Sequence, residues 1–252
     1  WLRDDETPTE QTKKQIFEAV DKSLERLQTD YIDLYQLHWP DRPMSLFGGS
    51  INYQHVEGDA NSIESILGAL SELIKIGKIR NIGLSNETPW GTMEFIHQSK
   101  DKDLPKMQSI QNAYNLLNRI FEFGGSEIAF RESVGLLAYS PLAQGYLTGK
   151  YQNGNLPKGS RKELFDRLQR YEGVGSEEAI ESYLNIAKKY NVDPSQLANQ
   201  FVTTRPFVTS NIIGATSMEQ LKLAVTSIEV NLTEEIENDI EKAFQKHGNV
   251  AS

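Results

Sequence analysis

The chain has 252 residues, 38% of them hydrophobic, and a formal net charge of -9. This length and apolar content can bury a sizeable core, in one large domain or two small ones. The negative charge argues against nucleic acid and anionic membranes as partners, because both require a basic face. No apolar run approaches the roughly 20 residues of a membrane span. Since the chain has no cysteine, disulfides and thiolate chemistry are excluded and we expect a cytoplasmic protein.

The N-terminal segment predicts an amphipathic helix. Thr7 is a suitable N-cap, Pro8 suits the first helical position, and Glu10 completes a capping box. Apolar residues then recur on one helical face as far as Leu27. The chain opens on Trp1 in place of an initiating methionine and shows no signal peptide, so we expect that a preceding part of the protein is missing from this sequence.

The stretch "IDLYQLHWPD", residues 32–41, predicts a buried parallel strand that ends at a histidine. Its nearly continuous apolar run is typical of a strand covered on both faces, and Pro40 ends the hydrogen-bonded ladder. His38 therefore lies at the carboxyl end of a strand, where alternating strand-helix folds bind ligands. From these residues alone, His38 is either a hydrogen-bonded packing residue or a catalytic one.

The rest of the chain alternates regularly between the two types of element. After a polar loop at about 43–60, helices are predicted at 61–77 (stopped by Gly77), 89–101, between 115 and 134, and at 177–190, 194–204, 217–228 and 233–246. Further strands are predicted at 79–87, 106–115, 134–145 and 210–217. Five strands, each followed by a helix, predict an α/β fold with a parallel sheet, either doubly wound or closed into a (β/α)8 TIM barrel.

Polar side chains after all five strands favour the barrel, because a ring lets successive strands supply one site. The segments concerned are "HWPD", "LSNE", "QNAYN", "AYSPLAQG" and "GATS". We find no internal repeat, low-complexity segment or linker, so a single domain over 1–252 is expected.

Five ordered strings resemble the aldo-keto reductase family, most closely its Tas-type branch of NADPH-dependent reductases. They are "DLYQLHWPD", "GKIRNIGLSN", "SIQNAYNLLNR", "LLAYSPLAQGYLTGKY" and "IIGATSMEQL". The resemblance implies a (β/α)8 barrel that reduces aldehydes or ketones by hydride transfer from NADPH. In such an enzyme the cofactor supplies the chemistry and the protein supplies placement and polarisation.

The resemblance also implies roles for individual residues. His38 would orient the substrate carbonyl, with Trp39 beside the substrate. The nicotinamide carboxamide would be bound by Ser85, Asn86 and Gln111, and Tyr139 would stack on the ring. The phosphates would be held by the turn formed by Ser140, Pro141, Leu142, Ala143 and Gly145, by the cations Lys150 and Arg161, and near a helix N-terminus by Gly214, Thr216 and Gln220.

The chain departs from the family pattern in two places. Leu223 and Ala224 stand where the family often has a Glu-Asn pair for adenine, which leaves open how strongly NADPH is preferred over NADH. No segment matches the family's catalytic Asp, Tyr and Lys, so we expect that about three strands carrying them lie outside these 252 residues. An alternative function is a nucleotide-binding regulatory module, similar to potassium-channel β-subunits.

Other chemistries have little support in the sequence. The histidines His38, His55, His97 and His247 have no metal-ligand spacing, so no metal site is expected. The expected partner is a small carbonyl substrate, whose identity would depend on loops such as 43–60.

Overall fold

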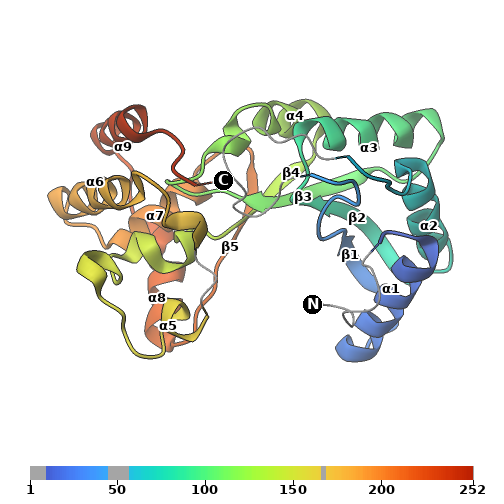
Figure 1. Cartoon of the computed structure of the whole chain (residues 1–252), viewed down its shortest axis with the longest axis horizontal. Helices are drawn as coiled ribbons and strands as arrows, with labels where there is room; N and C mark the ends of the chain where they lie inside the picture. The colour runs from blue at the N-terminus through green and yellow to red at the C-terminus, as the bar shows by residue number, and fades with distance from the viewer. Residues whose placement is uncertain (1–9, 45–56, 166–168, 252) are drawn as a thin grey trace. The chain divides into compact units, whose positions relative to one another are not determined.

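The structure is a computed structural model that describes residues 10–44, 57–165 and 169–251. Within these residues, five strands alternate with helices along the chain (Figure 1). The strands are β1 (Ile32–Gln36), β2 (Ile79–Ser85), β3 (Met107–Ala113), β4 (Gly135–Tyr139) and β5 (Val208–Ile212). The α-helices are α1 (Lys13–Leu27), α2 (Ile63–Lys75), α3 (Pro89–Asp101), α4 (Gly125–Glu132), α5 (Arg161–Leu164), α6 (Ser176–Lys189), α7 (Pro194–Thr203), α8 (Met218–Thr226) and α9 (Glu234–His247). This alternation of parallel strands with helices confirms the predicted fold class and corresponds to part of a (β/α)8 barrel.

The chain forms two compact units. Of the described residues, the first unit contains 10–44, 57–111 and 128–135, and the second contains 112–127, 136–165 and 169–251. Because this division reflects how contacts cluster, the expectation of a single domain stays a prediction.

The first unit is built on parallel strands in the order β1-β2-β3. The register places Gln36 opposite Gly83 and Ser85 opposite Gln111. Helices α1, α2 and α3 pack side by side, and α2 contacts β2 (Figure 1). Their apolar faces form the core of this unit, which includes Val20, Leu24, Ile66, Leu67, Leu70, Leu73, Ile82, Leu84, Ile96 and Met107. Amphipathic helices on a parallel sheet thus bury the residues whose spacing predicted them.

The second unit contains β5 and most of β4, paired in parallel, with Leu136 opposite Val208 and Tyr139 opposite Ile212. Helix α7 contacts β5, α6 and α8, while α9 packs on α6. The apolar core of this unit includes Tyr114, Leu117, Leu136, Ala138, Tyr171, Tyr183, Leu197, Phe201, Ile236 and Ile240. In contrast, none of the residues of α8 is buried.

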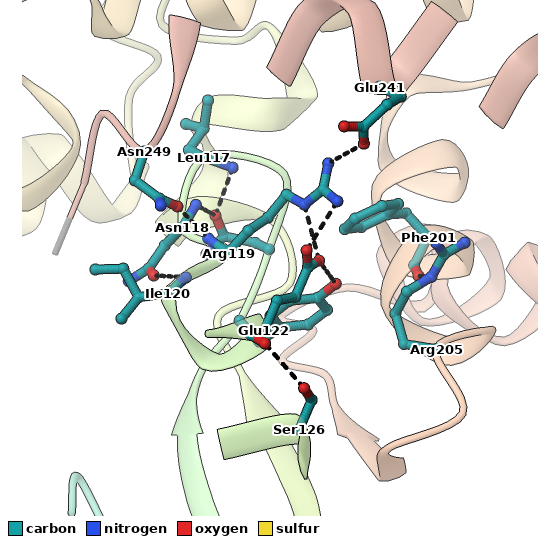
Figure 2. A network of polar contacts seen from close by, with 12 residues as sticks. Leu117, Asn118, Arg119, Ile120, Glu122, Ser126, Phe201, Arg205, Glu241 and Asn249 are labelled. Atoms are coloured by element: carbon teal, nitrogen blue, oxygen red, sulfur yellow. Dashed lines mark hydrogen bonds and ion pairs between the residues drawn. The ribbon is translucent and has the colours of Figure 1, made fainter. Parts of the chain in front are cut away.

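A polar network fixes the segment that follows β3 (Figure 2). The Arg119 guanidinium donates to Glu122 Oε1 at 2.8 Å and to Glu241 Oε2 at 3.1 Å, and the Tyr114 hydroxyl donates to Glu122 Oε1 at 2.5 Å. The main-chain N–H of Arg119 donates to Asn249 Oδ1 at 2.5 Å. The network therefore ties α9 and the residues after it to the turn beyond β3.

The start of the first helix differs from the prediction. Thr7 and Pro8 lie outside the described residues, and Glu10 precedes the helix, where its N–H donates to Gln15 Oε1 at 2.8 Å. The N-cap is Thr12, whose hydroxyl accepts from the N–H of Gln15. Glu10 therefore does not lie in the first turn of the described helix, which begins with a Thr-x-x-Gln cap at Thr12.

All five strands end earlier than predicted. Strand β1 stops at Gln36, β2 at Ser85, β3 at Ala113, β4 at Tyr139 and β5 at Ile212, because the polar segment after each strand leaves the ladder. The residues of β1 are half-buried or exposed, so the prediction of a strand covered on both faces is wrong. The β5 segment also begins earlier, at Val208. The polar strings thus form the loops after the strands. Among the described helices, none has the length and apolarity needed to cross a lipid bilayer.

Candidate active site

The predicted site residues fall in both units. His38, Trp39, Ser85, Asn86 and Gln111 belong to the first unit, and the residues from Tyr139 onward belong to the second. Much of the loop predicted to shape the substrate pocket, residues 45–56, lies outside the described part of the chain.

His38 is held next to the end of β2 through its main chain. It follows the last residue of β1 by two positions, and its carbonyl accepts from Asn86 Nδ2 at 2.8 Å. The imidazole is exposed, and its ring centroid lies 4.5 Å from that of Trp39. Partial desolvation lowers the pKa of His38 and so favours the neutral imidazole, which can donate from one nitrogen while accepting at the other.

Ser85, Asn86 and Gln111 form one connected cluster. The Ser85 hydroxyl donates to the Gln111 carbonyl at 2.7 Å, and the N–H of Asn86 donates to the same oxygen at 3.0 Å. Asn86 Nδ2 also donates to Ser85 Oγ at 3.1 Å. Asn86 has φ 55°, a left-handed conformation that asparagine tolerates better than most residues and that aims its side chain back at His38. The structure thus brings together the amides predicted to bind a carboxamide.

Two further polar residues in this unit were not predicted. Gln36 contacts Gln111, and Glu87 receives the guanidinium of Arg42, with one bond to Oε2 at 2.9 Å. The Glu87 side chain is only 2% exposed, so its charge depends on Arg42. An exposed Trp90 ring lies 5.0 Å from the same guanidinium. The ion pair fixes the start of α3 relative to the loop after β1.

The turn after β4 has an unusual backbone. Ser140, Ala143 and Gln144 are non-glycine residues with φ of 59°, 47° and 58°. Leu142, at φ -91° and ψ 13°, precedes the left-handed Ala143, and this right-then-left order turns successive N–H groups toward one side. The N–H groups of Ala143 and Gly145 donate within the turn, to the carbonyls of Ser140 at 2.9 Å and Leu142 at 2.8 Å, so these two are not offered to a phosphate. Residues held in sparsely populated backbone regions cluster at ligand sites.

One side chain beside this turn also fits a phosphate group. A Cβ placed on Gly145 would come within 2.7 Å of Lys150 Cε, so the Lys150 side chain lies directly against the turn. Among the described residues, Lys150 makes no ion pair. The Gln144 amide has a buried oxygen without a hydrogen-bond partner. A cation beside the turn suits the pyrophosphate of a dinucleotide, whereas the Gln144 oxygen requires a hydrogen-bond donor and does not suit a phosphate oxygen.

The aromatic residue at the end of β4 is also anchored. The Tyr139 hydroxyl accepts from Arg170 Nη1 at 3.3 Å. Asn115 Nδ2 donates to the Ser140 carbonyl at 2.9 Å and to the Tyr171 hydroxyl at 3.0 Å. Asn115 and Tyr171 are buried, so they hold the strand end rigidly. Sequence reasoning missed both residues, although "QNAYN" marked the end of the preceding strand.

The remaining predicted phosphate ligands lie at exposed positions. Arg161 is the first residue of the short helix α5. Thr216 donates to Gln220 Oε1 through its N–H at 2.9 Å and its hydroxyl at 3.1 Å, just before the N-cap of α8 at Ser217. A Cβ at Gly214 would meet open space. An open hollow of about 430 Å³ lies at this helix start and is lined by Ile213, Ala215, Thr216, Ser217, Met218 and Leu221.

Comparisons with known proteins agree on one family. The sequence profile of the Aldo/keto reductase family matches residues 2–244. Protein tas of Escherichia coli is 47% identical over 234 residues, which cover 92% of this chain and 67% of the relative. A Babesia bovis protein named aldo-keto reductase is 39% identical over 261 residues, covering 98% of this chain and 91% of the relative. L-glyceraldehyde 3-phosphate reductase of Escherichia coli is 28% identical over 230 residues, covering 88% of this chain and 60% of the relative.

Proposed function

Since the chain belongs to the aldo-keto reductase family of oxidoreductases, we propose that it acts in the reduction of aldehyde or ketone carbonyls with NADPH as the hydride donor. The observation that carries this proposal is the cluster of Ser85, Asn86 and Gln111, bonded to the main chain of His38. It offers amide donors and acceptors next to an imidazole, which suits a carboxamide beside a polarised carbonyl.

The residues of this chain have distinct roles in the proposal. Bound NADPH would supply the hydride. Ser85, Asn86 and Gln111 would hold the carboxamide and so fix which ring face points toward the substrate. His38, whose neutral form is favoured by its lowered pKa, would donate a hydrogen bond to the carbonyl oxygen as negative charge develops on it. In the second unit, the turn from Ser140 to Gly145 with Lys150 would hold phosphate groups.

The proposal assigns carbonyl orientation and cofactor binding to this chain, and not protonation. The family's catalytic tyrosine, with its lysine and aspartate, has no matching segment here. A second candidate function is a nucleotide-binding regulatory module that binds NADPH without rapid turnover. The two functions share the cofactor cluster and differ in whether a carbonyl is consumed.

Two measurements on the complete protein, including the strands expected outside these 252 residues, test the proposal. Fluorescence titration with NADPH should give saturable binding, and the absorbance of NADPH should fall steadily with a panel of small aldehydes and diketones. Saturable binding without turnover above an enzyme-free background would favour the regulatory module. If NADPH does not bind, both functions are wrong. For substitutions at Gln111, the matched control is Gln108→Ala, because Gln108 is an exposed amide on the same strand.

We also propose that the physiological partner is a small carbonyl compound in the cytoplasm, and neither nucleic acid nor a membrane. The net charge of -9 and the absence of cysteine support this part of the proposal. Cosedimentation with anionic vesicles at low salt would contradict it.

A further inference from the structure

The strand that leads to His38 carries an amide that no part of the proposed function uses. Gln36 is the last residue of β1, and its side chain crosses β2 to reach β3. The crossing is possible because Gly83 lies between the two strands. A Cβ at Gly83 would come within 2.6 Å of Ser109 Oγ and 3.2 Å of Gln36 Cγ. The register agrees, since Gly83 pairs with Gln36 on one side and with Ser109 on the other.

The hydrogen bonds of Gln36 have only one consistent direction. Gln36 Nε2 donates to the main-chain carbonyl of Leu84 at 3.2 Å and lies 3.5 Å from Ser109 Oγ. A main-chain carbonyl can only accept, so the NH2 end of Gln36 must face Leu84. The oxygen of Gln36 then faces Gln111, whose Nε2 donates to it at 2.9 Å. A carbonyl of β2 thereby sets the orientation of two successive amides.

The hydrogen bonds from Leu84 through Gln36 determine which side-chain atom Gln111 presents to a ligand. Its main-chain carbonyl is occupied by Ser85 and Asn86, and its Nε2 is directed to Gln36. Its Oε1 accepts no hydrogen bond from the described residues. Gln111 is half-buried. A ligand at this cluster therefore meets a fixed acceptor oxygen, and not an amide that could rotate to present its NH2 group.

We propose that Gln36 is a positioning residue that locks Gln111 with its carbonyl oxygen toward the cofactor, so that the cluster selects a carboxamide by its NH2 group. The inference rests on the proposed function, because it requires a nicotinamide nucleotide at Gln111. It adds a specificity that the cluster alone does not have, since an unrestrained glutamine could bind either the carbonyl or the NH2 of the carboxamide.

An analogue of NADP+ tests this directly. The 3-acetylpyridine analogue keeps the ring carbonyl and replaces the NH2 by a methyl group. The unmodified protein should bind NADP+ about 3- to 10-fold more tightly than the analogue, which is the range of one neutral hydrogen bond. Gln36→Met keeps the length of the side chain and removes the acceptor, so this ratio should fall to about 1 as Gln111 becomes free to turn.

Gln36→Glu separates positioning from stability. Its carboxylate still accepts from Gln111 Nε2, so the binding ratio should be kept. Its other oxygen faces the Leu84 carbonyl, so the melting temperature should fall. A purely structural role predicts that ratio and stability decline together in both variants. Gln108→Met, at an exposed position of the same strand, should change neither the ratio nor the affinity.

The outcomes distinguish this inference from the function on which it rests. If NADP+ does not bind the unmodified protein, the proposed function is overturned. If it binds but the analogue binds equally well, or if Gln36→Met keeps the unmodified ratio, the proposed function stands and the role of Gln36 is overturned. Loss of the ratio in Gln36→Glu as complete as in Gln36→Met also contradicts the positioning role.

Discussion

At the scale of single residues, His38 is joined to Asn86 through its main-chain carbonyl, so the imidazole can be removed without breaking this bond. We expect His38→Ala to lower kcat by about 10²- to 10³-fold, the usual cost of one donor to a developing oxyanion. The dissociation constant of NADPH should change less than about 2-fold. Steady-state kinetics and fluorescence titration measure the two effects. Lost NADPH affinity with normal turnover would place His38 on the cofactor instead.

Gln111 should show the opposite behaviour. Gln111→Ala leaves the Gln36 oxygen without its donor and removes the proposed acceptor for the carboxamide. Binding of NADPH should weaken by about 1 to 3 kcal/mol, the cost of an unpaired buried polar group. Titration of this variant beside Gln108→Ala measures the loss. An unchanged affinity would mean that the carboxamide does not lie at Gln111.

The sequence predicted the surroundings of His38 better than it predicted Gln36. Ser85, Asn86 and Gln111 follow recognisable strand patterns, and the structure joins them by hydrogen bonds. Gln36 is a single amide inside an apolar run, and its partners Leu84 and Gln111 are 48 and 75 residues away. Local patterns contain no information on such distant partners.

At the scale of elements, local sequence patterns also leave the boundaries of helices open. Thr7 and Thr12 both begin a Thr-x-x-Glu/Gln motif, so the sequence offers two helix starts of similar quality. In the described residues the helix begins after Thr12, and Ile16 and Val20 on its apolar face are buried. The start of the helix does not change this face, which is set by the spacing of the apolar residues. Helix boundaries therefore depend on single local signals, whereas the long amphipathic helices were predictable because their whole length has one period.

The segment between β4 and α6 is closed by a small charged cluster. Lys162 Nζ lies 2.5 Å from Glu172 Oε1, and the Tyr146 hydroxyl donates to the same carboxylate. The hydrogen bond from Lys162, followed by that from Tyr146, lowers the pKa of Glu172 below its usual 4.5. The pKa of Tyr146 is raised to about 12, first by burial and then by this bond. The cluster therefore ties α5 to residues that lie before and after it in the chain.

The shifted carboxylate predicts a pH dependence. A group with a lower pKa in the folded state stabilises the fold above its unfolded pKa, and this contribution is lost as the pH falls from 4.5 through the folded value. Glu172→Gln should cost less than about 1 kcal/mol at pH 7, because the pair is partly exposed. The difference from the unmodified protein should disappear in acid. Urea unfolding from pH 7 to pH 3 measures it, with Glu181→Gln as a surface control; a difference independent of pH would contradict the assignment.

At the scale of the whole molecule, the regular alternation of five strands with helices made the fold class predictable, because each period extends over many residues. The five strand-end motifs together indicated the family, which the profile match confirms. The division of contacts into two units had no such signal, since no linker or change in composition marks it. The effect of NADPH on the stability of the whole chain tests the proposed cofactor.

NADPH should stabilise the entire chain if it binds the native state alone. At a concentration 100-fold above its dissociation constant, a ligand adds about 2.7 kcal/mol to the free energy of unfolding. For a chain of this size, each kcal/mol raises the melting temperature by about 2 to 4 °C, so we expect a rise of about 5 to 10 °C. Differential scanning calorimetry with and without NADPH measures it. Gln111→Ala at the same NADPH concentration should show a smaller rise in melting temperature, because weaker binding adds less to the free energy of unfolding. Gln108→Ala should match the unmodified protein. A rise of equal size in all three proteins would mean that NADPH stabilises the chain through a site that does not include Gln111.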